Sequence, residues 1–238
     1  MTYSQLEAFL ADPVRENTIP FLWEFRLKAL HKGALSNFSD LKDKPAPESC
    51  HRWETRYFFP YGESTHIIVP AFESTMYNAD QYRFKVHRDI YLLTESGREN
   101  VKIRFKKSSM ELLQKSQLYD QDGIEGYAKK VLEDLSCEKS FDSITIEDVH
   151  LMLKQAQTID SEVFRPIALH RMLKESMVVD LSSVSAKLEL SKVYSQGKIY
   201  LSLNIESKSF YGLKFLKGML NFDARPCSYM EFLEGHLT

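Results

Sequence analysis

The sequence predicts an α+β fold built around an antiparallel sheet, and three observations lead to that prediction. Apolar and charged residues alternate with the two-residue period of a β-strand in several segments, of which residues 101–107 are the clearest. Short polar turns of the kind that join hairpin strands separate these segments. Segments with helical periodicity precede, interrupt and follow the strands, so we expect helices that flank the sheet and are inserted into it.

Two helices are predicted before the sheet begins, over about residues 4–13 and 18–33, because apolar residues recur there at three- and four-residue spacing. A linker-like segment rich in charge and proline, residues 40–47, separates them from the strands. We therefore expect an N-terminal helical segment, residues 1–50, that packs on a larger domain of residues 51–238.

The larger domain is predicted to alternate between strands and helices. A helical insertion is expected over about residues 123–157, because residues 123–135 have helical spacing and Thr145 and Asp148 have the pattern of a capping box. The predicted strands are residues 51–60, 65–72, 83–93, 101–107, 110–118, 167–179, 186–193 and 198–207, and the C-terminal helical segments are residues 209–220 and 227–233.

The composition is that of a globular chain whose charge is nearly balanced. Of its 238 residues 43% are hydrophobic, and the formal net charge is −2, so no basic excess attracts nucleic acid to the whole surface. Three cysteines, Cys50, Cys137 and Cys227, lie far apart without a metal-ligand pattern. Because we find no secretory signal and no apolar run of about 18 residues, we expect an intracellular protein, cytoplasmic or nuclear, with no membrane contact.

Charged residues share one face of several predicted strands. The clearest strand places Lys102, Arg104 and Lys106 on one face and apolar residues on the other. The first strand places Glu54 and Arg56 together in the same way. If these faces converge, they form a site that holds both cations and carboxylates. If they point outward, they are a solvated surface or a set of ion pairs, and the alternation alone leaves both interpretations open.

Taken together, these segments resemble the motifs of the triphosphate-tunnel, or CYTH, superfamily. Residues 52–56 (Arg-Trp-Glu-Thr-Arg) are similar to its Glu-x-Glu-x-Lys strand, and residues 203–206 (Leu-Asn-Ile-Glu) stand where a second Glu-x-Glu is expected. The resemblance covers residues 51–234, and the ending is most similar to that of fungal-type RNA 5′-triphosphatases. The other matches to the family's Asp-x-Tyr, basic-x-Arg, later Lys, acid-bearing strand and Ser-Tyr ending are Asp89-Ile-Tyr91, Lys102-Ile-Arg104, Lys115, residues 187–193 and residues 228–234.

The resemblance implies that eight antiparallel strands close into a barrel or tunnel that holds a triphosphate. Basic side chains would neutralise the phosphates through charge-assisted hydrogen bonds, and glutamates would bind Mg²⁺ or Mn²⁺, which activates water for hydrolysis. Carried over to this chain, the substrate-binding residues are Arg56, Lys102, Arg104, Lys106, Lys115, Arg171 and Lys187, the metal ligands are Glu54, Glu189 and Glu206, and the catalytic residues are Glu54 and Glu206.

Two departures from the family's motifs bear on catalysis. Arg52 and Asn204 each stand where a motif glutamate belongs, so each removes a metal ligand, and Arg52 would also repel the cation. Three functions therefore stay open. The first is a metal-dependent phosphohydrolase that acts on a triphosphate, such as the 5′ end of RNA. The second is a non-catalytic protein that binds triphosphate, polyphosphate or RNA 5′ ends, and the third is a barrel that acts through protein contacts, as a homodimer or a subunit of a larger complex.

Overall fold

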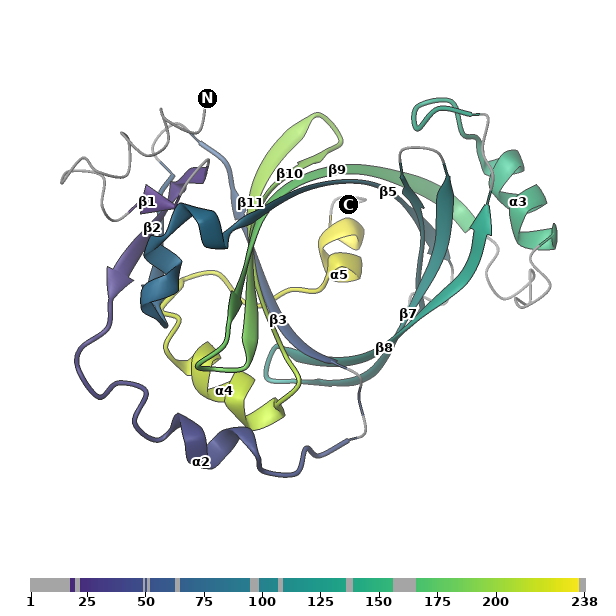
Figure 1. The fold of residues 1–238 in the computed structure, drawn as a ribbon. Coiled ribbons are helices and arrows are strands. Elements are labelled where there is room, and N and C mark those ends of the chain that lie inside the picture. The colour runs from purple at the N-terminus through teal and green to yellow at the C-terminus, as the bar shows by residue number, and fades with distance from the viewer. Residues whose placement is uncertain are drawn as a thin grey trace.

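An eight-stranded antiparallel barrel forms the centre of the structure, which is a computed structural model (Figure 1). This barrel confirms the predicted α+β fold. The structure describes residues 18–19, 22–48, 50, 52–62, 65–94, 99–106, 109–135, 139–155 and 166–235. The barrel strands are β3 (Arg52–Pro60), β5 (Arg83–Thr94), β6 (Glu99–Phe105), β7 (Met110–Gln121), β8 (Ile124–Leu135), β9 (Pro166–Leu181), β10 (Ala186–Ser195) and β11 (Lys198–Ser207). They close in the order β10-β11-β3-β8-β7-β6-β5-β9.

The other elements surround this barrel. A separate sheet contains β1 (Thr18–Ile19), β2 (Leu22–Ala29) and β4 (Ile67–Ala71). Within the described residues, no helix combines the length and the apolar character needed to cross a bilayer. The helices are α2 (Phe38–Lys42), which enters the segment predicted as a linker, α3 (Ile146–Gln155), α4 (Phe210–Gly218) and α5 (Tyr229–Glu234), with short 3-10 turns η1 (Ser74–Tyr77) and η2 (Ala79–Gln81).

The apolar faces of the barrel strands point outward, where the surrounding elements cover them. On one side α2, α4 and the three-stranded sheet share a core with Trp53, Leu188 and Leu203 of the barrel wall. On another side α3 packs over Ile90 and Ile103 (Figure 1). Because the apolar residues of each strand are buried outside the wall, the residues that alternate with them point into the barrel.

The helix predicted over residues 18–33 is wrong, because β1 and β2 occupy that segment. In β2 the buried residues Phe25 and Leu27 alternate with exposed basic residues, which is the period of a strand. The strand predicted over residues 65–72 forms as β4, but it pairs in parallel with β2 and belongs to the second sheet. The helix predicted over residues 4–13 lies outside the described residues.

The helix predicted over residues 123–135 is also wrong, because that segment is β8. Asp122 and Gly123 both have positive φ (55° and 68°) and form the two-residue turn between β7 and β8. Two register shifts interrupt the pairing in this hairpin, between residues 112 and 113 and between residues 117 and 119. The apolar residues of β8 lie on both of its faces, since Ile124 is buried in the core outside the wall and Tyr127 lines the inside of the barrel. No apolar alternation therefore marks this strand in the sequence.

Two helices begin with capping boxes. At α3, which is the helix of the predicted insertion, the Thr145 backbone donates to Asp148 over 2.9 Å and the Asp148 backbone donates to Thr145 over 3.2 Å, as the sequence predicts. At α5, Ser228 and Glu231 exchange equivalent hydrogen bonds of 2.7 and 3.0 Å. These caps satisfy backbone N–H groups that would otherwise be free in the first turn of each helix.

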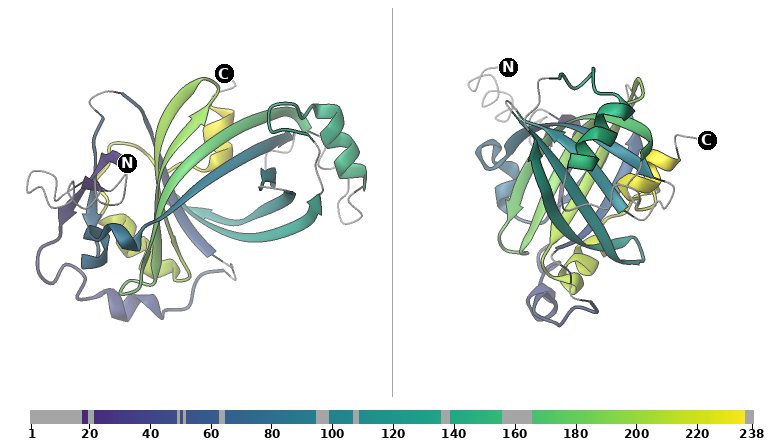
Figure 2. Two further views of the ribbon diagram at one scale, coloured as in Figure 1. Left: turned by 45° about the horizontal axis from the view of Figure 1, so that its top comes forward. Right: turned by 90° about the vertical axis from the view of Figure 1, so that its right-hand side faces the viewer.

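Helix α5 lies across one end of the barrel (Figure 2). Its residues Tyr229, Phe232 and Leu233 are buried against Tyr91 and Val193 of the barrel wall. A six-residue helix is not stable by itself, so this packing holds α5 in place. The barrel is therefore covered at this end by a part of its own core.

Replacing Gly126 by alanine is expected to destabilise the fold by about 1–3 kcal/mol, because a Cβ there would lie 2.6 Å from a ring carbon of the buried Trp53. The matched control is Gly218→Ala at the end of α4, where a Cβ would have no neighbour within 4 Å. The control should leave the free energy of unfolding unchanged or raise it slightly. Urea denaturation of both variants measures this, and equal stability of the two would contradict the packing of Trp53 against β8.

Candidate functional site

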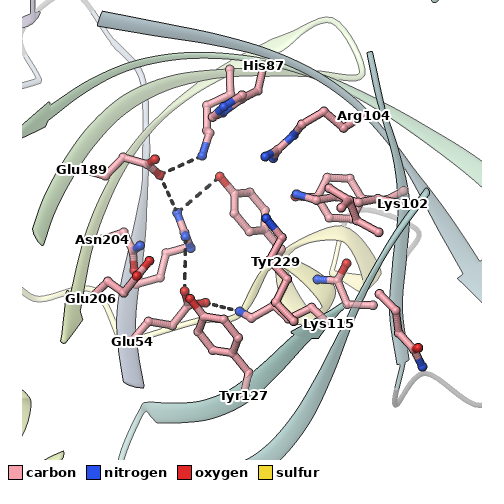
Figure 3. Close-up of a pocket in the computed structure, with 17 residues that line it drawn as sticks. Glu54, His87, Lys102, Arg104, Lys115, Tyr127, Glu189, Asn204, Glu206 and Tyr229 are labelled. Carbon is pink, nitrogen blue, oxygen red and sulfur yellow. Dashed lines mark hydrogen bonds and ion pairs between the residues drawn. The ribbon is translucent and has the colours of Figure 1, made fainter. Parts of the chain in front are cut away.

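The barrel encloses a cavity of about 150 Å³ (Figure 3). Among the described residues, six basic side chains and three carboxylates line it, together with tyrosines and neutral polar groups. The excess of basic groups in a partly enclosed space makes the cavity attractive to an anion. The basic residues are Arg56, Lys102, Arg104, Lys115, Lys129 and Lys174, and the carboxylates are Glu54, Glu189 and Glu206.

Strand register brings these charges together from distant parts of the sequence. Arg56 on β3 is paired with Asn204 on β11, and Glu54 is paired with Glu206 on the same strand. On its other side β3 pairs with β8, which places Glu125 next to Glu54. The charged faces of the two strands with glutamate motifs are therefore adjacent and converge on one cavity.

Asp89 on β5 orients two of the basic side chains. It accepts two hydrogen bonds of 2.8 Å from the Arg104 guanidinium and one of 2.7 Å from Lys102, which also donates to the Tyr91 hydroxyl over 3.1 Å. Burial would raise the pKa of Asp89, but Lys102 and Arg104 hold it well below its usual range. Burial lowers the pKa of Lys102 to about 7, and the charge of Arg104 acts in the same direction against the effect of Asp89.

Arg56 is a buried residue of the cavity and is held from several sides. It donates to the Tyr229 hydroxyl over 3.3 Å, and its guanidinium lies 4.2 Å from the centre of that ring. Its terminal nitrogens lie 3.5 Å from Glu189 and 3.8 Å from Glu54. With its amide turned to satisfy both neighbours, Asn204 accepts from Arg56 over 3.0 Å. The asparagine at a motif glutamate position thus serves as a neutral acceptor for Arg56.

Glu54 is held in an ion pair and is not free to bind a metal ion. Its carboxylate accepts a hydrogen bond from Lys115, whose ammonium also lies 3.6 Å from Glu125. Burial would raise the pKa of Glu54, but the charges of Lys115 and Arg56 lower it to about 2. Burial raises the pKa of Glu125, and the charge of Glu54 adds to this shift, although Lys115 opposes it. Glu54 is therefore ionised, and its charge is matched by the cations beside it.

The predicted metal ligands do not fit a divalent cation in this arrangement. Glu189 accepts from Lys174 over 2.7 Å, Glu206 lies 3.3 Å from Arg52, and Glu54 is bonded as described above. Across the described residues, no three histidine, cysteine, aspartate or glutamate side chains come together as a set that could hold a metal ion. Mg²⁺ in such sites is usually held by one or two carboxylates together with water and phosphate oxygens, and each of these carboxylates is already paired with a cation, so we derive no chemical step through a metal.

Three of the predicted substrate-binding residues lie outside the cavity. Lys106 follows the end of β6, is 47% exposed and pairs with a carboxylate of β7. Arg171 donates to the backbone oxygens of Phe141, over 3.2 Å, and Ile144, so it anchors the segment before α3 on the outside of the barrel. Lys187 lies near the start of β10 and does not line the cavity. The predicted substrate-binding residues that do line it are Arg56, Lys102, Arg104 and Lys115.

Sequence reasoning missed several cavity residues. The choice of Arg171 as an inward residue misassigned β9, because Lys174, three positions on, occupies the inner face instead. Lys129 was missed because its segment was predicted to be helical. His87 also lines the cavity, where burial, and then the charges of Arg104 and Lys174, lower its pKa to about 3 and keep it neutral.

No family model and no curated protein sequence matches this chain. Among solved structures, it is similar to the Hippeastrum protein HpAC1, described as revealing a dominant triphosphatase activity, at 12% identity and a TM-score of 0.43 over 78% of this chain and 86% of that one. A conserved hypothetical protein of Pyrococcus furiosus is 17% identical, with a TM-score of 0.41 over 75% of this chain and 98% of that one. The Pct1 RNA triphosphatase of S. pombe is 11% identical, with a TM-score of 0.27 over 78% and 83%.

All three TM-scores are below 0.5, and all identities are below 25%. Similarity at this level shows nothing about the activity of this chain.

The stability of the protein should depend on pH through Lys102. Its pKa of about 7 in the folded state is below the usual lysine value, so above pH 7 the unfolded chain binds more protons than the folded one. The free energy of unfolding should therefore rise with pH above 7, by up to about 1.4 kcal/mol per pH unit from this group. Urea denaturation at pH 7, 8 and 9 measures the slope, and Lys102→Met should reduce it. The same slope in both proteins would contradict the burial of this amine.

Proposed function

We propose that the barrel binds an oligophosphate anion, namely a triphosphate group carried by a larger ligand, in its basic cavity. The observation that supports this is an excess of basic side chains over carboxylates around one enclosed space. Among the described residues, six basic side chains line it, against three carboxylates that line it and that of Asp89, which bonds Lys102 and Arg104. An anion that joins these groups would balance the remaining positive charge. A triphosphate supplies several negative charges and many acceptor oxygens, which arginine and lysine bind through charge-assisted hydrogen bonds.

The basic side chains are oriented before any ligand arrives, so binding loses little side-chain entropy. Asp89 fixes Lys102 and Arg104, and Glu189 holds Lys174. Lys102 and Arg104 remain 15% and 18% exposed, so an anion can reach them although they are largely withdrawn from water. Because the pKa of Lys102 is about 7, an approaching anion would also stabilise its protonated form.

Within this class of ligand we favour the 5′-triphosphate end of RNA. The resemblance of residues 228–234 to the ending of fungal-type RNA 5′-triphosphatases supports this choice. The formal net charge of −2 gives the chain no overall attraction for the phosphate backbone of RNA. The affinity would therefore come from the triphosphate end, and it would depend little on nucleotide sequence.

Binding without hydrolysis agrees best with the state of the carboxylates, since Glu54, Glu189 and Glu206 each pair with a basic residue. Hydrolysis of the bound triphosphate is the second candidate. It is favoured by the direct cross-strand pairing of Glu54 and Glu206, which line the same cavity. Mg²⁺ or Mn²⁺ would have to displace Lys115 and Arg52 from these carboxylates before it could bind there.

Arg104→Ala should weaken the binding of tripolyphosphate by about 10- to 100-fold, because a charge-assisted hydrogen bond contributes about 1.5–3 kcal/mol. Arg88→Ala is the matched control, since Arg88 is exposed on the outer face of β5 and the net charge changes equally. Isothermal titration calorimetry without divalent cations measures both affinities. Equal loss in the two variants would show that tripolyphosphate binds by overall charge and not in the cavity.

The two candidate functions are separated by an assay for phosphate release. The full chain is incubated with tripolyphosphate or triphosphate-ended RNA, with and without Mg²⁺ or Mn²⁺, and compared with Glu54→Gln. We expect tight binding without phosphate release. Metal-dependent release that disappears in Glu54→Gln would replace this conclusion with the second candidate and would show that the ion pair of Glu54 and Lys115 opens.

A further inference from the structure

The described elements that surround the barrel leave one part of its outer wall uncovered. Helix α3 packs over Ile90 on one side, and α2, α4 and the second sheet share a core with Leu188 on the other. Between them β5, β9 and β10 lie side by side (Figure 1). We call this part the uncovered face and define it by Phe84, Val86, Arg88, Leu173 and Tyr194. None of these side chains belongs to a hydrophobic cluster of the described part of the chain.

The alternation along the strands shows that this face points away from the cavity. His87 and Lys174 line the cavity. Their neighbours Arg88 and Leu173 therefore lie on the outer face of the wall. Leu173 is paired with Arg88 on one side and with Tyr194 on the other, so the residues of the uncovered face form one continuous surface across three strands.

The uncovered face exposes large apolar side chains. Phe84 and Val86 are 58% and 46% exposed. Ile90, on the same outer face of β5 but under α3, is fully buried. A further element that packed over Phe84 and Val86 would remove their apolar area from water and so stabilise the fold.

Arg88 is the charged side chain of the uncovered face that lacks a partner. It is exposed, and its side chain forms no hydrogen bond or ion pair with any residue that the structure describes. By contrast, Glu175 beside the face accepts a hydrogen bond of 3.0 Å from the Tyr194 hydroxyl. A carboxylate brought onto this face would therefore meet a guanidinium that is free to bind it through two hydrogen bonds.

The chain contains a segment of matching chemistry before its first described strand. Residues 4–13 are predicted to form a helix and hold no basic residue. Its apolar stripe consists of Leu6, Phe9 and Leu10. At 3.6 residues per turn, Glu7 and Asp12 border this stripe on its two sides, each about 60° around the helix from the nearest apolar residue. The predicted helix therefore combines an apolar stripe with carboxylates beside it, which complements the uncovered face.

This segment is long enough to reach the uncovered face. The described chain begins at Thr18 of β1, which is paired with Arg26 of β2. Glu24 of β2 lies 2.7 Å from Lys192 of β10, so the second sheet stands beside the uncovered face. Two strand spacings, together about 10 Å, separate β10 from β5. A helix of ten residues and a four-residue connection span roughly 28 Å, which exceeds that distance.

From these observations we propose that residues 4–13 pack as an amphipathic helix on the uncovered face. The apolar stripe of the helix contacts Phe84, Val86 and Leu173, and one of its carboxylates pairs with Arg88. The outer hydrophobic core then continues from the second sheet to α3, and the face is not available to a second copy of the chain. This inference does not depend on the ligand of the cavity, so it can fail or hold independently of the proposed function.

The test measures how fast a thiol on the uncovered face of the full chain reacts with N-ethylmaleimide. Val86→Cys supplies the thiol, and mass spectrometry of the peptide that carries it separates its reaction from those of the natural cysteines. In this protein Phe9→Asp should speed the reaction at least about tenfold, because a charge in the apolar stripe releases the helix from the face. Ala8→Asp is the matched control, since Ala8 lies on the opposite side of the predicted helix, and it should leave the rate unchanged.

Equal rates in Phe9→Asp and Ala8→Asp would overturn the inference, and the size of the common rate shows what holds instead. A fast reaction in all three proteins means that nothing covers the face. A slow reaction that becomes faster on dilution means that a second copy covers it, and a slow reaction at every concentration means that another part of the chain does. Thermal unfolding of the three proteins establishes that the barrel is folded in each.

Discussion

The ion pairs of Asp89 are the interaction on which the cavity depends. A single buried carboxylate accepts hydrogen bonds from Lys102 and Arg104, so two like charges can lie close together away from water. Glu189 does the same for Lys174 and Arg56, and Glu54 does so for Lys115. These ion pairs stabilise the basic cavity in the folded protein without a ligand. They also hold its side chains in positions from which they can bind an anion.

This arrangement is possible because the barrel has its hydrophobic core on the outside. Helices α2, α4 and α3 and the second sheet bury the apolar residues of the wall, so the folding free energy does not depend on filling the barrel with apolar side chains. The inner face is then free to carry charge. At α5 a hydrophobic cluster reaches the barrel, and Tyr229 of that cluster accepts a hydrogen bond from Arg56.

The sequence predicts most of the barrel because seven of its eight strands have a visible alternation or a clear apolar run. The exception is β8, whose apolar residues Ile124 and Tyr127 lie on opposite faces of the strand and so hide the alternation. The turn at Asp122 and Gly123 is the signal that would have identified it, since that pair favours a two-residue hairpin. Strand β2 was missed for a related reason, because its short apolar pattern fits both periods.

The candidate site is harder to predict from the sequence. The strand face on which a side chain lies, and the residues that it contacts, depend on how the strands pair. Alternation placed Lys102 and Arg104 on one face correctly, but it cannot say that Lys106 would lie beyond the end of β6. The register of β9, which turns Arg171 outward and Lys174 inward, follows from contacts far away in the sequence. The same holds for the carboxylates, since only the folded barrel brings Lys115 to Glu54 and Arg52 to Glu206.

A crystal structure of the full chain with tripolyphosphate would test the central claim most directly. The account predicts phosphate density inside the barrel, with oxygens at about 2.7–3.0 Å from the side chains of Arg56, Lys102 and Arg104. Density only on the outer surface, for example beside Lys106, together with a cavity whose ion pairs are undisturbed, would contradict the claim that this barrel is an oligophosphate site.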